Sequence, residues 1–286
     1  MSELTTTDEI DVAGEPEIVV LPDPEACGTF AAERIAAALS DAVAARGRAH
    51  WLTTGGSTPA GTYRHLSIAP LRDRVPWDDV ELWLGDERFV PRDHPLSNVK
   101  VADDVLIDIG ALEGESGTGS YGIDVVRGTM PGAPIPAVNV HPMPTSKAIA
   151  GNHDTDWCAA QYAEMLRAGG PPLENGWPVF DVALLGVGPD GHVLSVFPGS
   201  ATFDRSEVVL GVPAPTHVEP HVARVTLNPA VLGVARTVFV VAQGDAKAEI
   251  LPDVLHGPRD PRRLPAQLAR RVGATWILDR AAARLL

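Results

Sequence analysis

Residues 180–200 read FDVALLGVGPDGHVLSVFPGS, a short apolar run that leads into a glycine-rich turn. An apolar run of this length, bounded by glycine and proline, predicts a strand that is buried on both faces. The turn matches G-x-G-x-x-G, the fingerprint of dinucleotide-binding proteins. It also leads directly into His192, so its glycines could position a histidine instead of a pyrophosphate. These two interpretations predict different chemistry, and the neighbouring residues separate them.

The residues after the turn disfavour a dinucleotide. The fingerprint needs a continuing helix whose N-terminus holds the pyrophosphate. Here Pro189 occupies a variable position, and Pro198 limits any helix to a few residues. The acid expected about twenty residues further on should end the next strand, whereas Glu207 precedes it. We therefore expect no organic cofactor and keep a nicotinamide-linked oxidoreductase only as an alternative.

The histidine interpretation gives each residue of the turn a role. Asp190 lies two positions before His192, so on a tight turn its carboxylate would accept a hydrogen bond from the imidazole and support an imidazolium. Gly186, Gly188 and Gly191 would let the backbone turn sharply and approach a ligand. An Asp-Gly-His turn alone fits an Asx-turn beside a surface histidine equally well, so the decision depends on other segments.

A second glycine turn predicts an anion site. The segment LTTGGSTPAG at 52–61 follows an expected strand and opens an expected helix. Gly55 and Gly56 would expose backbone N–H groups, and Ser57 would add a hydroxyl at the helix N-terminus, where anions bind readily. The segment lacks the G-K-[ST] of nucleotide P-loops, so it favours a sugar phosphate over ATP. A plain helix cap is the alternative.

Charged residues follow several of the expected strands. In LGDERFVPRDHPLSN at 84–98, Arg88 is a candidate clamp for a phosphate or carboxylate, and Asp86 is a candidate ligand of sugar hydroxyls. Arg224 and Lys247 also lie near strand or helix ends and could complete the cationic side of a phosphate pocket. Each of these residues alone could equally be a solvated surface charge.

The order of elements predicts a Rossmann-like three-layer α/β/α fold with a mostly parallel sheet, because short apolar runs alternate with helical patterns. In such sheets the chemistry lies beyond the carboxyl ends of the strands. We expect a disordered tail at 1–15 and a single α/β domain at 16–286, with a Gly-rich surface insertion at about 109–136. The expected elements are strands at 17–23, 79–90, 180–188 and 274–279, helices at 24–47, 97–108 and 154–170, and strand–helix units at 49–66, 221–235 and 236–255.

Composition restricts the partners. The 286 residues include 37 acidic and 23 basic ones, a net charge of −14, so we expect no nucleic acid. No apolar run predicts a membrane span, and the acidic N-terminus does not resemble a signal peptide. Cys27 and Cys158 are expected to be free thiols, which favours a cytoplasmic protein. His217 and His221 are four residues apart, but Pro220 breaks the helical face of a zinc pair, so we expect no metal.

Taken together, these segments resemble the 6-phosphogluconolactonase family, which is grouped with the glucosamine-6-phosphate deaminases. The matching segments occur in the family's order: TGGSTP (54–59), GDERFVPRDHPLSN (85–98), GVGPDGHVLSVFPG (186–199), RVTLNPAVLGVA (224–235) and GDAKAEIL (244–251). The resemblance implies a phosphate site at Gly55, Gly56, Ser57, Arg224 and Lys247, with Asp86 and Arg88 on the substrate and His192 as the catalytic base beside Asp190. Val193 and Leu194 depart from the Thr and Ala that these lactonases usually carry.

The deaminase branch fits less well, because it carries Asn-Glu-Pro shortly after its Asp-Gly-His, whereas this chain has SVFPG without a carboxylate. The resemblance therefore implies a cytoplasmic hydrolase of the pentose phosphate pathway. Its expected substrate is a phosphosugar lactone, 6-phospho-D-glucono-1,5-lactone, and its expected state is a monomer or weak homodimer. A glucosamine-6-phosphate deaminase or isomerase and a non-catalytic sugar-phosphate-binding protein are the alternatives.

Overall fold

The structure, a computed structural model, describes residues 14–107, 116–118, 124–126 and 132–286. The disordered tail predicted at 1–15 lies outside these residues except for its last two positions. Most of the insertion predicted at 109–136 also lies outside them. Of this insertion, strands β5 (Ser116–Thr118) and β6 (Asp124–Val126) are described, and they pair antiparallel.

The core element is a seven-stranded sheet in the order β1-β14-β13-β10-β2-β3-β7. Every pair of neighbours in it is parallel, which confirms the predicted fold class. Its strands are β1 (Glu17–Leu21), β2 (Ala49–Thr53), β3 (Val80–Leu84), β7 (Val140–His141), β10 (Val182–Leu185), β13 (Thr237–Ala242) and β14 (Ala274–Asp279).

The strand order reverses between β2 and β10. From β2 the chain adds β3 and then β7 on one side. It then returns to place β10 on the other side of β2, and continues outward to β13 and β14. The connections that leave the carboxyl ends of β2 and β10 therefore diverge to opposite sides, and such a switch point leaves a crevice for a ligand. Both glycine turns predicted from the sequence directly follow these two strands.

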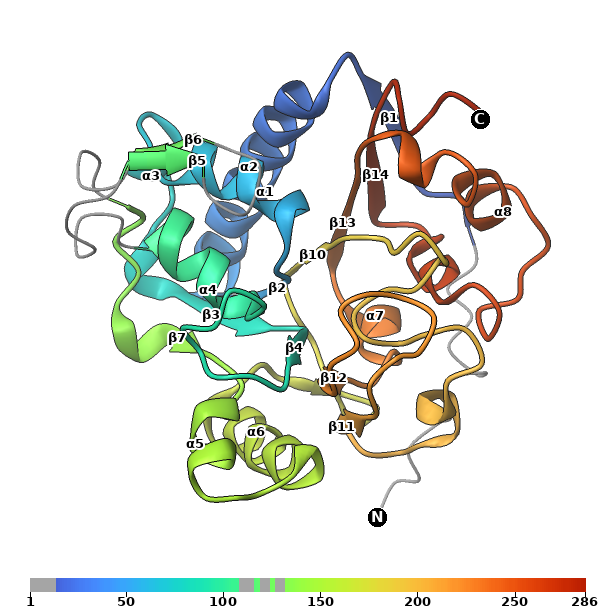
Figure 1. Ribbon diagram of the computed structural model, residues 1–286. Helices are drawn as coiled ribbons and strands as arrows, with labels where there is room; N and C mark the ends of the chain where they lie inside the picture. The colour runs from blue at the N-terminus through green and yellow to red at the C-terminus, as the bar shows by residue number, and fades with distance from the viewer. Residues whose placement is uncertain (1–13, 108–115, 119–123, 127–131) are drawn as a thin grey trace.

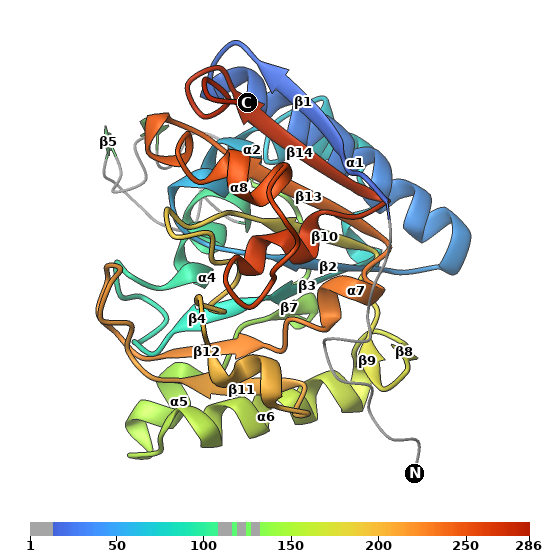
Figure 2. The same cartoon turned by 90° about the vertical axis from the view of Figure 1, so that its right-hand side faces the viewer.

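Helices cover both faces of the sheet (Figures 1 and 2). They are α1 (Pro24–Arg46), α2 (Ser57–Leu66), α3 (Leu71–Arg74), α4 (Asn98–Val101), α5 (Thr145–Ala150), α6 (Thr155–Gly169), α7 (Val231–Val234) and α8 (Leu251–Leu255). Alternate residues of β10 show the two faces: Val182 and Leu184 pack with α1 and α2, while Ala183 and Leu185 pack with α6, α7 and α8. Burial on both sides explains why this strand reads as an unbroken apolar run.

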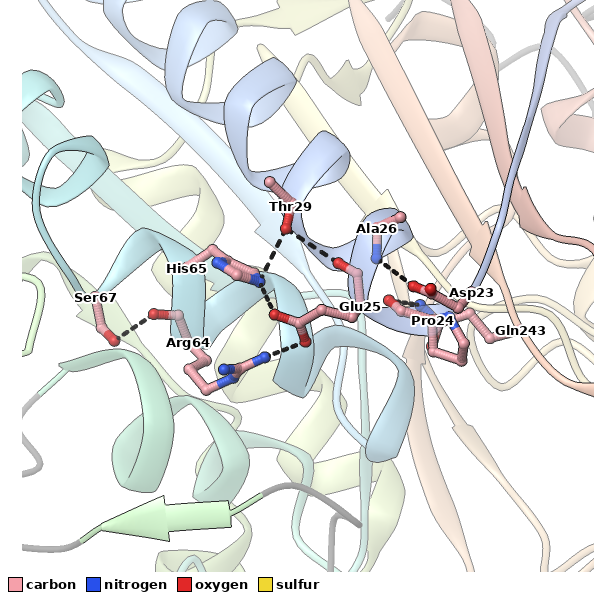
Figure 3. A network of polar contacts seen from close by, with 9 residues as sticks. All are labelled: Asp23, Pro24, Glu25, Ala26, Thr29, Arg64, His65, Ser67 and Gln243. Atoms are coloured by element: carbon pink, nitrogen blue, oxygen red, sulfur yellow. Dashed lines mark hydrogen bonds and ion pairs between the residues drawn. The ribbon is translucent and has the colours of Figure 1, made fainter.

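The longest helix, α1, covers the helix predicted at 24–47 up to Arg46 and is capped at both ends. The Asp23 side chain accepts a hydrogen bond from the Ala26 N–H at 2.8 Å, and Gly47 ends the helix in the left-handed region at φ 77°. Figure 3 shows how the first turn of α1 holds the last turn of α2: Glu25 contacts both Arg64 and His65. This network fixes α2 from its carboxyl end and leaves its amino end toward the crevice.

A second, antiparallel sheet was not predicted. It contains β11 (Val209–Val212), β12 (Arg224–Leu227) and β4 (Asp86–Arg88) in that order. The register places Arg224 opposite Arg88. β4 lies within the strand predicted at 79–90, which the structure divides into β3 and β4. The three residues of β4 are all charged, and nothing in the local sequence indicates that they pair with β12 instead of the main sheet. This small sheet brings two predicted site segments together that lie far apart in the sequence.

The helix predicted at 97–108 differs in detail. α4 is one turn long and continues as a π-helix at Ala102–Ile107. Ser97 is the N-cap residue, but its side chain makes no capping hydrogen bond. The buried Glu87 carboxylate instead accepts from the N–H groups of Asn98 at 2.6 Å and Val99 at 3.0 Å. A capping group from another element cannot be recognised from local sequence.

The remaining predictions concern thiols and membranes. Cys27 and Cys158 are both buried and free, as expected. Across the described ranges, we find no helix with both the length and the apolar character that a bilayer crossing requires.

Candidate active site

A cavity of about 210 Å³ lies at the switch point between β2 and β10. Its walls come from both glycine turns, from β4 and β12, and from the segment after β13. Most of the predicted site residues line it: Gly55, Gly56, Asp86, Arg88, His192, Arg224 and Lys247. Asp190 contacts His192 instead of lining the cavity itself. Ser57 begins α2 at the rim, and its side chain lies outside the described set.

His192 and Asp190 form the contact that their spacing predicts. The Nδ1 atom of His192 lies 2.5 Å from Oδ1 of Asp190. Burial alone would raise the pKa of Asp190, but hydrogen bonding and charge from His192, with a further bond from His217, hold that pKa well below its usual range. Because an ionised carboxylate only accepts hydrogen bonds, the His192 proton sits on Nδ1. Nε2 is then the basic nitrogen available to a ligand in the cavity.

The glycine turn makes room for this histidine. A Cβ atom added to Gly188 would lie 2.0 Å from the His192 Nδ1 atom, so no larger residue fits. Gly191 adopts φ 81°, a left-handed conformation that glycine accepts without strain. No helix follows the turn in this part of the described chain. The G-x-G-x-x-G pattern here therefore positions an imidazole and lacks the helix of a dinucleotide site.

The part of the cavity wall that leads into α2 is suited to an anion. The N-cap residue of α2 is Gly56, which has φ 89° and provides no side-chain capping bond, so the first N–H groups of the helix stay available. A Cβ atom added to Gly55 would lie 2.3 Å from the Asn98 Cα atom, which shows how closely this turn packs against α4. Bare N–H groups at a helix N-terminus bind phosphate and carboxylate groups.

Two cations line the same cavity, Arg224 buried and Lys247 half-buried. Arg224 is 4% exposed, and its Nη2 atom donates to the Pro220 carbonyl at 2.8 Å. Its Nη1 atom is buried without a hydrogen-bond partner among the described residues. Burial, followed by repulsion from Arg88, lowers the pKa of Arg224 to about 10. Burial also lowers the pKa of Lys247, and attraction to Asp190 opposes this. An anionic ligand would relieve both costs.

Asp86 and Arg88 are held by the protein itself. Ser195 Oγ donates to Asp86 Oδ2 at 2.6 Å, and Asn98 Nδ2 donates to Asp86 Oδ1 at 3.1 Å. Arg88 donates to the side-chain oxygen of Asn98 and, at 3.3 Å, to the Leu96 carbonyl. Sequence reasoning missed Asn98 and Ser195 as cavity residues. Both occur inside segments already singled out, but only the fold brings them to Asp86.

Glu87 is the buried anchor of this wall and was also missed. It is 1% exposed, and besides the N–H groups of α4 it accepts hydrogen bonds from the Arg88 N–H at 2.8 Å and from Ser97 Oγ at 3.0 Å. Burial raises its pKa to about 7, although these hydrogen bonds act in the opposite direction. Glu87 therefore fixes the backbone on which Arg88 and Asn98 lie.

The histidines near residue 220 do not form a pair. His217 Nε2 lies 2.9 Å from Asp190 Oδ2, whereas His221 Nδ1 contacts the Pro215 carbonyl at 2.8 Å. The expectation that the two do not share a helical face agrees with these positions, but the contact of His217 with Asp190 was not foreseen. Within the described residues, no group of three or more His, Cys, Asp or Glu side chains is placed to hold a metal ion.

A family model described as "Glucosamine-6-phosphate isomerases/6-phosphogluconolactonase" matches residues 22–277. The chain belongs to this family. The 6-phosphogluconolactonase of Streptomyces coelicolor is 34% identical over 95% of this chain and 95% of that protein. The 6-phosphogluconolactonase of Mycobacterium tuberculosis is 33% identical over 94% of this chain and 98% of that protein.

Solved structures agree with the family assignment. The 6-phosphogluconolactonase from Trypanosoma brucei superposes with a TM-score of 0.75 at 28% identity, covering 96% of this chain and 100% of that chain. A monomeric glucosamine-6-phosphate deaminase shares the fold, with a TM-score of 0.66 at 20% identity. The chain is thus an enzyme of the glucosamine-6-phosphate isomerase/6-phosphogluconolactonase family, matched over nearly its full length by lactonases.

Proposed function

We propose that this protein hydrolyses 6-phospho-D-glucono-1,5-lactone to 6-phosphogluconate, as in the oxidative pentose phosphate pathway. The observation that carries the proposal is one cavity whose wall contains both an oriented histidine and the turn that leads into the α2 N-terminus. The resemblance to named lactonases supports the same reaction. The proposal requires no organic cofactor or metal, because a lactone is already an activated ester.

The phosphate would dock at the part of the cavity wall that leads into α2. The N–H groups at the start of α2 and the Ser57 hydroxyl would donate hydrogen bonds to the phosphate oxygens. Arg224 and Lys247 would add positive charge beside them. The Arg224 Nη1 atom, buried without a partner among the described residues, supports this assignment because a phosphate oxygen would satisfy it. The phosphate is remote from C1, so its binding energy serves to place the ester beside His192.

His192 would act as general base through Nε2. It takes a proton from water while the water oxygen attacks C1, and a tetrahedral oxyanion forms. When this intermediate collapses, the bond between C1 and the ring oxygen breaks, and the imidazolium returns its proton to that oxygen. The product acid then loses a proton to solvent. Asp190 stabilises the imidazolium throughout, and a base positioned in this way contributes about 10²–10⁴-fold.

The oxyanion needs a donor, and Arg88 is the predicted residue best placed to supply it. The alternative donors are the amides of the glycine turn. Two of these are already used inside the turn, since Gly188 N donates to the His192 carbonyl at 2.9 Å and Gly191 N to the Gly188 carbonyl at 3.1 Å. A preorganised donor of this kind is worth about 3–4 kcal/mol in the transition state. Asp86, held by Ser195, would meet the sugar hydroxyls.

We extend the proposal to the whole chain. Residues 16–286 would act as one domain, since β1 and β14, from opposite ends of the sequence, pair along their full length. The protein would work in the cytoplasm as a monomer or weak homodimer on a small phosphosugar lactone.

The test is hydrolysis of freshly generated 6-phosphogluconolactone by the purified protein, measured above the spontaneous rate. We expect His192→Ala to lower kcat at least 100-fold, while 6-phosphogluconate still binds with nearly the wild-type Kd in calorimetry. We expect Arg224→Met to weaken the binding of 6-phosphogluconate and to raise KM at least tenfold. Wild-type turnover no faster than the spontaneous rate would overturn the proposal, and ammonia release from glucosamine 6-phosphate would favour the deaminase alternative.

A further inference from the structure

Asp190 contacts two imidazoles, one on each carboxylate oxygen. Oδ1 lies 2.5 Å from His192 Nδ1, and Oδ2 lies 2.9 Å from His217 Nε2. Because the ionised carboxylate only accepts, His217 must donate from Nε2. Only His192 lines the cavity, so the second imidazole has no place in the reaction as proposed above.

The His217 ring is supported by packing as well as by this hydrogen bond. Phe197 lies between the two histidines: its ring centroid is 4.8 Å from that of His192 and 5.8 Å from that of His217, the latter in an edge-on contact at 85°. Phe197 and His217 together line a second cavity of about 330 Å³. The His217 side chain remains 48% exposed, so it can exchange protons with solvent.

We propose that His217 is a positioning residue, which holds the Asp190 carboxylate in the plane that aims Oδ1 at His192. The inference rests on the proposed hydrolysis and adds a residue to it. A carboxylate held at one oxygen can rotate about its Cβ–Cγ bond, whereas one held at both oxygens cannot without losing a hydrogen bond. His217 transfers no proton in this scheme, and its Nε2–H stays on the ring.

The arrangement also couples the two histidines. They share one negative charge, so protonation of His217 makes protonation of His192 less favourable. Other charged groups act on this chain of contacts from the surrounding elements. Lys247 faces Asp190 from the segment after β13, Arg205 lies across the second cavity, and on the loop of His217 itself Glu219 pairs with His221 at 3.1 Å.

Two substitutions separate the hydrogen bond that His217 donates to Asp190 from the charge that His217 can carry. His217→Gln keeps a neutral amide donor, and His217→Ala removes the donor. We expect His217→Ala to lower kcat about tenfold with KM within about twofold, the effect of one lost hydrogen bond to a charged group. His217→Gln should retain at least half of the wild-type kcat. His221→Ala is the matched control, because it changes a histidine of the same loop that does not contact Asp190.

The second readout is the titration of the His192 ring protons followed by NMR. We expect its midpoint to rise from wild type to His217→Gln and again to His217→Ala, by about half a pH unit or more in total. Equal midpoints in all three proteins, or a kcat for His217→Gln as low as that for His217→Ala, would overturn the inference. The titration needs no turnover, so it tests His217 even if the lactone proves not to be the substrate.

Discussion

At the scale of single residues, the buried charges around the cavity differ in whether the protein itself satisfies their hydrogen bonds. Arg224 Nη1 has no partner among the described residues, which suits an anionic ligand, whereas both carboxylate oxygens of Glu87 accept hydrogen bonds from the protein. Burying a charge costs free energy unless partners compensate for it. An anion bound to Arg224 would therefore offset the free energy of burying its guanidinium. The hydrogen bonds to Glu87 instead fix the backbone in the wall of the site.

The raised pKa of Glu87 makes a prediction about pH. In the folded protein this pKa is about 7, against an ordinary value of 4.5. The folded state therefore holds the proton more tightly, and the resulting stabilisation is present below pH 4.5 and is lost as the pH rises through about 7. We expect the free energy of unfolding of wild type, relative to Glu87→Gln, to fall by about 3 kcal/mol across this range.

Urea unfolding of both proteins at pH 5, 6, 7 and 8 measures this difference. The glutamine has nearly the same shape and does not titrate, so it serves as the reference. Parallel curves for the two proteins would contradict the raised pKa.

At the scale of elements, the position of α2 determines the proposed anion site. Its carboxyl end is fixed on α1 by Glu25, Arg64 and His65, and its amino end faces the cavity without a side-chain cap. The approach of the preceding turn to Asn98 depends on the missing side chain of Gly55. The position of this helix end is therefore set by contacts on both sides of it.

We expect Gly55→Ala to weaken phosphate binding. The new methyl group would meet the Asn98 backbone and push the start of α2 away from its neighbour. KM for the phospholactone should rise about tenfold or more, a cost of at least 1.4 kcal/mol in binding. Steady-state kinetics measures it.

Gly61→Ala provides the control inside the same helix, because an added Cβ there meets only the Gly28 Cα atom at 3.9 Å. This change should leave KM unaltered and stabilise the helix by up to about 1 kcal/mol. A similar KM for both variants would argue against the role of the turn.

The elements differ in how well sequence predicts them. The helix at α1 and the buried strands were predicted because their patterns are strongly apolar, and Gly47 marks the end of the helix. The division of the strand predicted at 79–90 into β3 and β4, and the short α4, were not predicted, since β4 depends on pairing with β12 and α4 is capped by the Glu87 carboxylate from another element. The site segments could be predicted from their motifs, while Asn98, Ser195 and His217 depended on the fold.

At the scale of the whole molecule, the carboxyl ends of the strands hold the cavity and the amino ends hold a structural cluster. The cavity lies at the carboxyl ends of β2 and β10. At the amino end of β10, the 5% exposed Asp181 accepts the His50 N–H at 2.8 Å and pairs with Arg46 at 2.8 Å and Arg236 at 3.3 Å. This cluster joins the end of α1 to three strands, and it is separate from the reaction.

Asp181→Ala should therefore affect stability and not catalysis. It leaves an N–H group and two arginines without their carboxylate, and these arginines are partly exposed, so we expect a loss of about 2 kcal/mol, or roughly 5 °C in Tm. KM should remain at the wild-type value. Calorimetry and kinetics on the same preparation measure both quantities.

Glu207→Ala removes an ion pair of half-exposed side chains with Arg205 and is the contrasting case. Its expected cost is below about 0.5 kcal/mol. Equal losses for the two variants would show that burial does not distinguish these carboxylates.

The place of β1 has a consequence for how the chain is made. Its partner in the sheet is β14, which residues 274–279 form more than 250 positions further along the chain (Figures 1 and 2). A ribosome therefore releases the first strand long before its hydrogen-bonding partner has been translated. The seam between β1 and β14 closes only after residues 274–279 have been made, and a nascent chain stalled anywhere before residue 274 leaves β1 unpaired and one sheet edge open.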